Sequence, residues 1–292
     1  MEKKHITAKM IVFGAFAAIF LLLFCVTTAD AQRIAVISPE KGTEPETYAD
    51  RLLGHLSDRH RTVERSAAEA AFASLSIATP FNQTAGETRS AGNVIGADIL
   101  IFVKVETQRR SSFEKPKYFE SSAALFLTGA RSGELFHFEL RKAEKDTPEE
   151  AFDALLTDAE TAADAITSLI PDLYRKELNA GPDANIEDHS RSAGQDKTTR
   201  PPMPYRQIKP TSTGEAFLFG IHATIDAEAD IDANGTISDI RVVRWAGYGL
   251  EKAVTDAIRK MTWRPAERNG KNLPMRVMLR YNFTKIEKTE KN

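Results

Sequence analysis

Histidine is the side chain best suited to exchange protons or bind metals near neutral pH, and the sequence contains six of them. They are His5, His55, His60, His137, His189 and His222. None belongs to an HExxH motif, and the single cysteine, Cys25, cannot build a CxxC-linked metal site. We interpret His55 and His60 as surface residues near a helix end, with a metal site as the alternative. The sequence therefore predicts no metal site.

Glycine-rich phosphate loops and activated serines are also missing from the sequence. There is no GxGxxG, GxxxxGK(S/T) or GxSxG, and the segment Gly129–Gly133 has Arg131 where the last pattern needs a serine. The acidic residues at 226–232 alternate along an expected strand, so their carboxylates form a solvated row and do not converge on one calcium ion. We predict that the protein is not an enzyme and uses no cofactor.

Several large polar and aromatic side chains in the last third of the chain could contact a ligand. The basic ones are Arg241, Arg244, Arg276 and Arg280. We interpret them as a solvated sheet face, and the alternative is a more specific role in contacting an acidic peptide. Trp263 is interpreted as a packing residue of the core or helix end.

Charge divides the chain into two parts. The net charge is −2, so the composition gives no support for a nucleic-acid partner. Residues 32–200 carry 21 basic and 28 acidic side chains, whereas residues 201–292 carry 15 and 11. The change of sign near residue 200 indicates two separately built units, which a chain of 292 residues can accommodate.

The N-terminus has the pattern of an export signal. Basic residues from Lys3 to Lys9 precede the apolar run Met10–Val26, and Ala29-Asp30-Ala31 supplies the small residues that signal peptidase accepts. We predict cleavage between Ala31 and Gln32 and a periplasmic or cell-envelope location. An uncleaved inner-membrane anchor is the alternative, because the run reaches the short limit of ~17 residues for a membrane span. Residues 1–31 are therefore a signal peptide or membrane anchor.

Residues 33–178 alternate between strand-like and helix-like patterns. Strands are expected at 33–37, 62–64, 97–105, 121–128 and 135–140, and helices at 45–59, 66–75 and 148–178. Residues 79–90 are expected to form a polar turn, and Pro171 to kink or divide the last helix. This order predicts a mixed α/β domain.

Residues 179–204 have few apolar side chains and are predicted to be an interdomain linker. From Phe217 to Ala233 every odd position is apolar, which predicts one strand with a buried face and a solvated face. Asn234-Gly235 predicts a tight hairpin turn with positive φ angles, followed by a returning strand at 236–245.

A helix and a last strand complete the C-terminal unit. The helix has one apolar stripe formed by Leu250, Val254, Ala257, Ile258 and Met261. Asn269-Gly270 predicts a second turn, and apolar residues alternate from Met275 to Phe283. The predicted fold class is α+β, with an N-terminal mixed α/β domain at 33–178 and a C-terminal β-β-α-β domain at 205–286.

The stretch DANGTISDIRVVRWAGYGLEKAVTDAIRKMTWRPAERNGKNLPMRVMLRYNF, which begins at Asp232, resembles a TonB C-terminal domain. Trp263, Pro265, Ala266 and Gly270 occupy positions that the family pattern requires. The sequence departs from the pattern at Trp245-Ala246, where Ser-Ser is common, and at Tyr205-Arg206, where Tyr-Pro is expected. We expect both departures near the peptide-binding side, where they would affect partner specificity.

Residues 33–142 show a weaker resemblance to the N-terminal domain of TolB and to CsgG-type curli secretion proteins. The matching pieces are IAVIS, YADRLLGHL, TVERSA and GADILIFVKV. This resemblance implies an envelope docking or assembly role, and it offers no active-site residues to transfer to this chain.

The TonB resemblance implies binding by β-augmentation, in which an extended peptide pairs with an open sheet edge. The candidate edge is the last strand, with Met275, Arg276, Val277, Met278, Leu279, Arg280 and Tyr281. The implied partners are envelope proteins. Outer-membrane receptors, inner-membrane motor proteins, a homodimer and membrane association through Met10–Val26 are open choices. Energy transduction to outer-membrane receptors for transport is one expectation; a periplasmic structural or assembly scaffold without energy coupling is the alternative.

Overall fold

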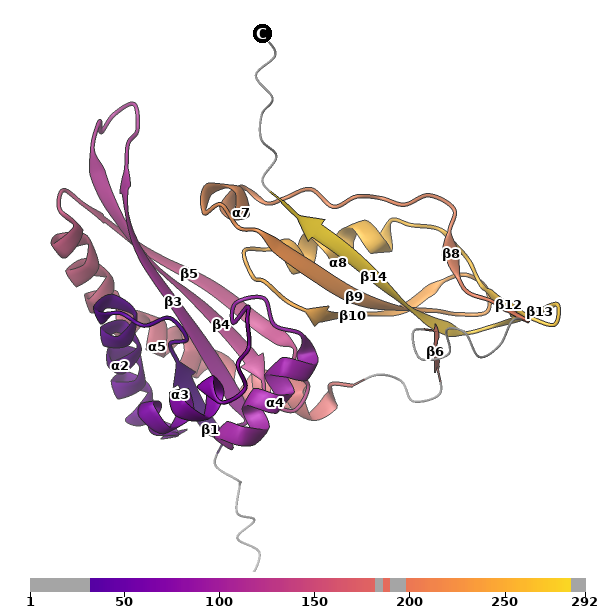
Figure 1. The fold of residues 1–292 in the computed structure, drawn as a ribbon, viewed down its shortest axis with the longest axis horizontal. Coiled ribbons are helices and arrows are strands. Elements are labelled where there is room, and N and C mark those ends of the chain that lie inside the picture. Colours follow the sequence, from indigo (N-terminus) through magenta and orange to yellow (C-terminus); the bar gives the residue numbers. More distant parts are fainter. Residues whose placement is uncertain (1–31, 182–185, 190–197, 285–292) are drawn as a thin grey trace, which may run out of the picture. The chain divides into compact units, whose positions relative to one another are not determined.

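The computed structural model describes residues 32–181, 186–189 and 198–284 (Figure 1). The expected signal or anchor at 1–31 and its cleavage site after Ala31 lie outside this range. Within these residues, no helix is long and apolar enough to cross a membrane. The chain has the predicted α+β fold, with an N-terminal α/β sheet and a C-terminal antiparallel sheet accompanied by a helix.

The N-terminal sheet has five strands in the order β2-β1-β3-β4-β5. These are β1 (Arg33–Ile37), β2 (Arg61–Thr62), β3 (Ile99–Arg110), β4 (Tyr118–Gly129) and β5 (Leu135–Lys145). β1 runs parallel to β2 and β3, whereas β4 and β5 continue the sheet as antiparallel strands. The central strand β3 is buried on both faces, as its continuous apolar run predicts.

Four helices accompany this sheet: α2 (Thr43–Ser57), α3 (Arg65–Ala73), α4 (Ala85–Ile95) and α5 (Pro148–Asn179). α2 and α5 cover one face (Figure 1), where Leu52 and Ile166 belong to the same core as Ile101. α5 continues through Pro171, so the expected division of this helix does not occur. The opposite face carries side chains such as Phe102 and Phe126, which belong to a second core.

The polar turn predicted at 79–90 is wrong in its second half, because α4 begins at Ala85. Thr84 Oγ1 accepts a hydrogen bond from the Glu87 N–H, and the Glu87 carboxylate accepts one from the Thr84 N–H. This capping box satisfies two groups at the start of the helix. Its Thr-x-x-Glu spacing was a sequence signal for the helix.

The C-terminal sheet has the order β10-β9-β14-β6. Its strands are β9 (Ala223–Ile231), β10 (Ile237–Arg244), β14 (Met275–Phe283) and the short β6 (Glu187–Asp188). The helix α8 (Leu250–Arg259) lies across this sheet in Figure 1. Ile225 and Ile231 are fully buried in the same core as Val254. The predicted β-β-α-β order is therefore confirmed.

The segment predicted as a linker at 179–204 contributes short strands to this unit. β7 (Thr199–Arg200) pairs with β12 (Ala266–Arg268), which also pairs with β13 (Lys271–Leu273). β8 (Met203–Pro204) pairs with β11 (Trp263–Arg264), and β6 pairs with β14. The predicted domain boundaries stay predictions. Residues from Gln32 onward form one compact unit.

The long strand expected from Phe217 begins later, at Ala223. Thr213 Oγ1 accepts the Ala216 N–H and caps the short helix α7 (Gly214–Leu218), and Gly220 then turns the chain with a φ of 61°. Phe217 is consequently 71% exposed. In the first hairpin only Gly235 has positive φ, whereas both Asn269 and Gly270 have positive φ in the second turn, as predicted.

Candidate functional site

The strand β14 has one paired edge and one largely unpaired edge. All nine of its residues pair with β9, but β6 pairs only with Met275 and Arg276 on the other side. Among the described residues, no strand pairs with that outer edge from Val277 to Phe283. An unpaired edge presents a row of backbone donors and acceptors to any extended chain.

A groove of about 470 Å³ lies beside this unpaired edge. β14 residues 278–283 form one wall, and Gln207, Lys209 and Pro210 form the other. Of the described residues that line it, the charged ones are Lys209 and Arg280, and both are exposed. The groove therefore combines a strand edge with two basic side chains.

The predicted edge residues divide into two groups. Met275, Arg276 and Val277 are at most 8% exposed and do not line the groove. The residues that do line it are Met278, Leu279, Arg280 and Tyr281. Met278 is 47% exposed and belongs to the even-numbered face of the strand, opposite the face that packs on α8.

The interpretation of the arginines and carboxylates as a solvated sheet face is wrong for its central members. Asp226, Asp230 and Arg276 are 3%, 1% and 5% exposed. Two Arg276 nitrogens donate to the Asp230 carboxylate at 2.6 and 2.7 Å. Neighbouring strands bring opposite charges into register here, and the paired side chains shield one another from water.

The same pairing continues toward the groove. Arg280 donates to both oxygens of Asp226 at 2.7 and 2.9 Å, and Arg244 donates to Asp226 from β10 at 3.2 Å. Burial raises the pKa of Asp226, but the hydrogen bonds from Arg280 and Arg244 outweigh it and hold that pKa below its ordinary value. Asp226 is therefore ionised at neutral pH and fixes the position of Arg280.

Trp245 lies where the sequence departs from the TonB pattern, but it does not line the groove beside β14. It is fully buried, with its ring 5.4 Å from that of Phe126 and 5.9 Å from that of Phe102. Its indole N–H donates to Thr88 Oγ1 at 3.1 Å. Both phenylalanines belong to the N-terminal sheet, so the expected role of Trp245 at the peptide-binding side is wrong. Trp245 joins the C-terminal unit to the N-terminal sheet.

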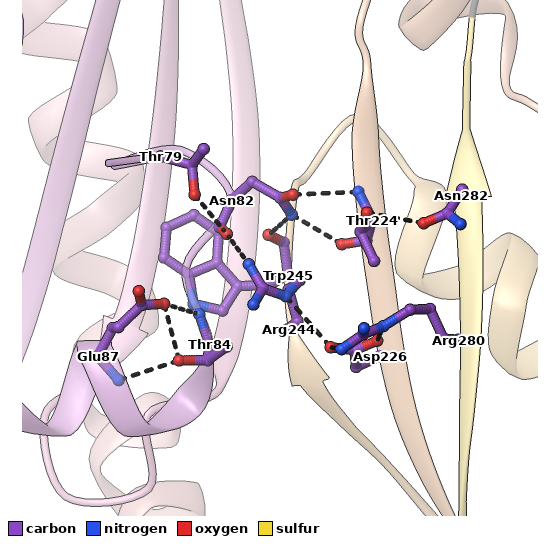
Figure 2. Close-up of polar contacts among 10 residues, drawn as sticks. All are labelled: Thr79, Asn82, Thr84, Glu87, Thr224, Asp226, Arg244, Trp245, Arg280 and Asn282. Atoms are coloured by element: carbon purple, nitrogen blue, oxygen red, sulfur yellow. Dashed lines mark hydrogen bonds and ion pairs between the residues drawn. The ribbon is translucent and has the colours of Figure 1, made fainter. Parts of the chain in front are cut away.

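Asn82 completes this junction (Figure 2). Its amide nitrogen donates to the backbone oxygens of Thr224 and Trp245 at 2.8 and 2.7 Å, and its amide oxygen accepts the Thr224 N–H at 3.0 Å. The Trp245 N–H also donates to the Gln83 carbonyl at 3.1 Å. One side chain from the loop before α4 thus satisfies backbone groups of two C-terminal segments.

Two chains of hydrogen bonds run from this loop to β14 (Figure 2). In one, Arg244 bridges the Asn82 carbonyl and Asp226, which holds Arg280. In the other, the Thr224 carbonyl accepts from the Asn82 amide nitrogen, and the Thr224 N–H donates to the Asn82 amide oxygen. The Thr224 hydroxyl then donates to the side-chain oxygen of Asn282 at 2.8 Å. Arg280 and Asn282 line the groove, so the N-terminal loop helps to position one wall of the candidate site.

Sequence reasoning missed this junction. Its one signal was a bulky tryptophan at a position where the related family carries a small polar residue. Trp263 is 5% exposed, which confirms its interpretation as a packing residue. Among the described residues, no group of three or more His, Cys, Asp or Glu side chains could hold a metal ion.

One family model matches the C-terminal part of the chain. Residues 215–284 match the family described as Gram-negative bacterial TonB protein C-terminal. The solution structure of the Pseudomonas aeruginosa TonB C-terminal domain is 19% identical, covers 36% of this chain and 98% of its own, and has a TM-score of 0.27. Lipoprotein GNA1162 from Neisseria meningitidis is 16% identical, covers 48% of this chain and 99% of its own, and has a TM-score of 0.33. No curated protein sequence matches.

The family match shows a TonB C-terminal domain at residues 215–284, and the chain is a cell-envelope protein that contains this domain. Domains of this family are typically non-enzymatic. The resemblance of residues 33–142 to TolB and CsgG-type proteins stays a prediction.

Proposed function

We propose that this protein binds an extended peptide segment of another envelope protein by strand addition at β14. The observation that carries the proposal is the unpaired edge from Val277 to Phe283, with a groove of about 470 Å³ beside part of it. Backbone pairing along the edge supplies affinity, and side-chain contacts in the groove select the sequence. Lys209 and Arg280 favour a segment with acidic side chains.

The partner is proposed to be an outer-membrane receptor or an inner-membrane motor protein, in keeping with the TonB-like domain. In that case the protein transmits energy for transport by pulling on the bound segment. This finer function requires Met10–Val26 to remain as a membrane anchor. N-terminal sequencing of the mature protein tests the requirement, because a chain that begins at Gln32 lacks this anchor.

A structural or assembly scaffold without energy coupling is the second candidate, and the junction around Trp245 favours it. The C-terminal unit is packed on the N-terminal sheet, and the predicted linker is paired with it through β6, β7 and β8. A segment paired in this way is a poor free spacer, whereas long reach across the periplasm needs an extended linker.

Proline substitutions at Met278 and Leu279 test strand addition. Successive residues of an edge strand direct their N–H groups alternately to the neighbouring strand and away from it. One of Met278→Pro and Leu279→Pro therefore removes a donor to β9, and the other removes a donor on the open edge. We expect the variant that lacks the donor to β9 to be destabilised. The variant that lacks the donor on the open edge should stay folded but no longer bind the partner.

The readout is covalent capture by a photoreactive amino acid at Gln207, which is exposed on the opposite wall of the groove, in the protein in its native envelope. We expect a discrete adduct with the parent sequence that the folded proline variant no longer forms. Circular dichroism identifies which variant is folded. Strand addition at this edge is contradicted if the folded variant forms the adduct as well as the parent does.

A further inference from the structure

β3 and β4 form a hairpin (Figure 1). Its turn carries an exposed aromatic side chain, that of Phe113. The Ser112 N–H donates to the Lys115 carbonyl at 2.8 Å, and the Lys115 N–H donates to Ser112 Oγ at 3.0 Å. Phe113 and Glu114 stand between these two residues. Phe113 is fully exposed, with a relative accessibility of 105%. The turn is closed by Ser112 and Lys115, so the phenylalanine ring is not needed to form it.

Basic side chains flank this apex. Arg109, Lys115 and Lys117 are exposed, and Glu114 is the acidic residue between positions 109 and 118. The ammonium group of Lys115 lies 5.9 Å from the ring centre of Tyr118, and that of Lys117 lies 5.4 Å from that of Phe119. These cation–π contacts hold the two ammonium groups beside the start of β4, next to the turn.

Single exposed apolar residues are common on protein surfaces and need no special explanation. Phe113 differs because complete exposure coincides with a local excess of positive charge on one turn. An aromatic side chain beside several Lys and Arg residues is the composition of segments that enter the interface of anionic membranes. Phenylalanine and arginine are enriched at protein–protein interfaces, but lysine, glutamate and serine, which make up most of positions 111–117, are depleted there, so this composition fits a protein partner less well.

We propose that the β3–β4 apex binds the surface of an anionic lipid bilayer. Phe113 enters the interfacial region, and Arg109, Lys115 and Lys117 contact lipid phosphates. This contact is separate from the peptide groove at β14 and from the apolar run Met10–Val26. It gives the N-terminal sheet a membrane-facing end that does not depend on a transmembrane anchor.

The test uses residues 32–292, which form one compact unit and omit the apolar run. Co-sedimentation is measured with vesicles of equal parts phosphatidylglycerol and phosphatidylcholine, and with vesicles of phosphatidylcholine alone. We expect binding to the anionic vesicles that weakens with added salt. Phe113→Ser should reduce the partition coefficient about tenfold, and Lys115→Gln or Lys117→Gln about fivefold each.

Phe217→Ser is the matched control, because this phenylalanine is also exposed, at 71%, but lies in α7. It should leave the partition coefficient unchanged, and circular dichroism should show that every variant is folded. The proposal is overturned if the protein does not prefer anionic vesicles. Equal losses for Phe113→Ser and Phe217→Ser would also overturn it, as would unchanged binding by Phe113→Ser and the two lysine variants.

Discussion

Trp245→Ala should lower the free energy of unfolding by about 3–5 kcal/mol, the usual cost of truncating a buried aromatic side chain. The ring is fully buried between Phe102 and Phe126, so its removal leaves a cavity on the N-terminal sheet. It also leaves the Thr88 hydroxyl without its indole donor. A loss of this size is a large fraction of the stability of an ordinary domain.

Urea unfolding followed by circular dichroism measures this loss. Trp245→Phe keeps an aromatic ring but lacks the indole N–H, so its loss should be smaller, about 1–2 kcal/mol. Tyr205→Ala is the surface control, because Tyr205 is 74% exposed and should change stability by no more than about 0.5 kcal/mol. If Trp245→Ala were as stable as Tyr205→Ala, the tryptophan would not hold the two parts of the chain together.

Arg276→Ala should destabilise the fold by about 3 kcal/mol, because it leaves the Asp230 carboxylate buried without its arginine. Asp230 is 1% exposed and receives two hydrogen bonds from Arg276. Removing both charges is expected to be milder. Arg276→Met combined with Asp230→Leu should therefore recover most of the loss, since two apolar side chains then meet in the same place.

Arg280→Ala on the same strand is the matched control for Arg276→Ala. The Arg280 side chain is 60% exposed, and Asp226 keeps a hydrogen bond from Arg244 after the change. We expect a much smaller loss of stability in chemical denaturation. Equal losses for the two arginine variants, or no recovery in the double variant, would show that burial does not distinguish these ion pairs.

Periodic patterns predicted the elements whose burial follows from the local sequence. The apolar stripe of α8 is buried, with Leu250, Val254 and Ile258 each at 0% exposure. The alternation of apolar residues from Phe217 predicted a strand that begins too early. The helix cap at Thr213 and the turn at Gly220 interrupt a pattern that looks continuous in the sequence. The backbone conformation there is set by a helix cap and one glycine, and it does not follow the periodicity of the side chains.

The candidate edge strand was chosen from the TonB resemblance and stays a prediction, whereas the final alternation of apolar residues predicted the range of β14. The burial of Asp230 and Arg276 could not be read from charge patterns, because it depends on the register with which β14 pairs with β9. The contact between Trp245 and Thr88 joins residues 157 positions apart, and no local pattern encodes such a contact.

Hydrogen–deuterium exchange of the protein with the partner peptide captured through position 207 tests strand addition most directly. An added strand protects the backbone N–H groups with which it pairs. We predict slower exchange on binding at alternate amides between Val277 and Phe283, and no change in β10, the opposite edge of the sheet. Unchanged exchange in β14, with protection in β10 or α8 instead, would contradict binding at this edge.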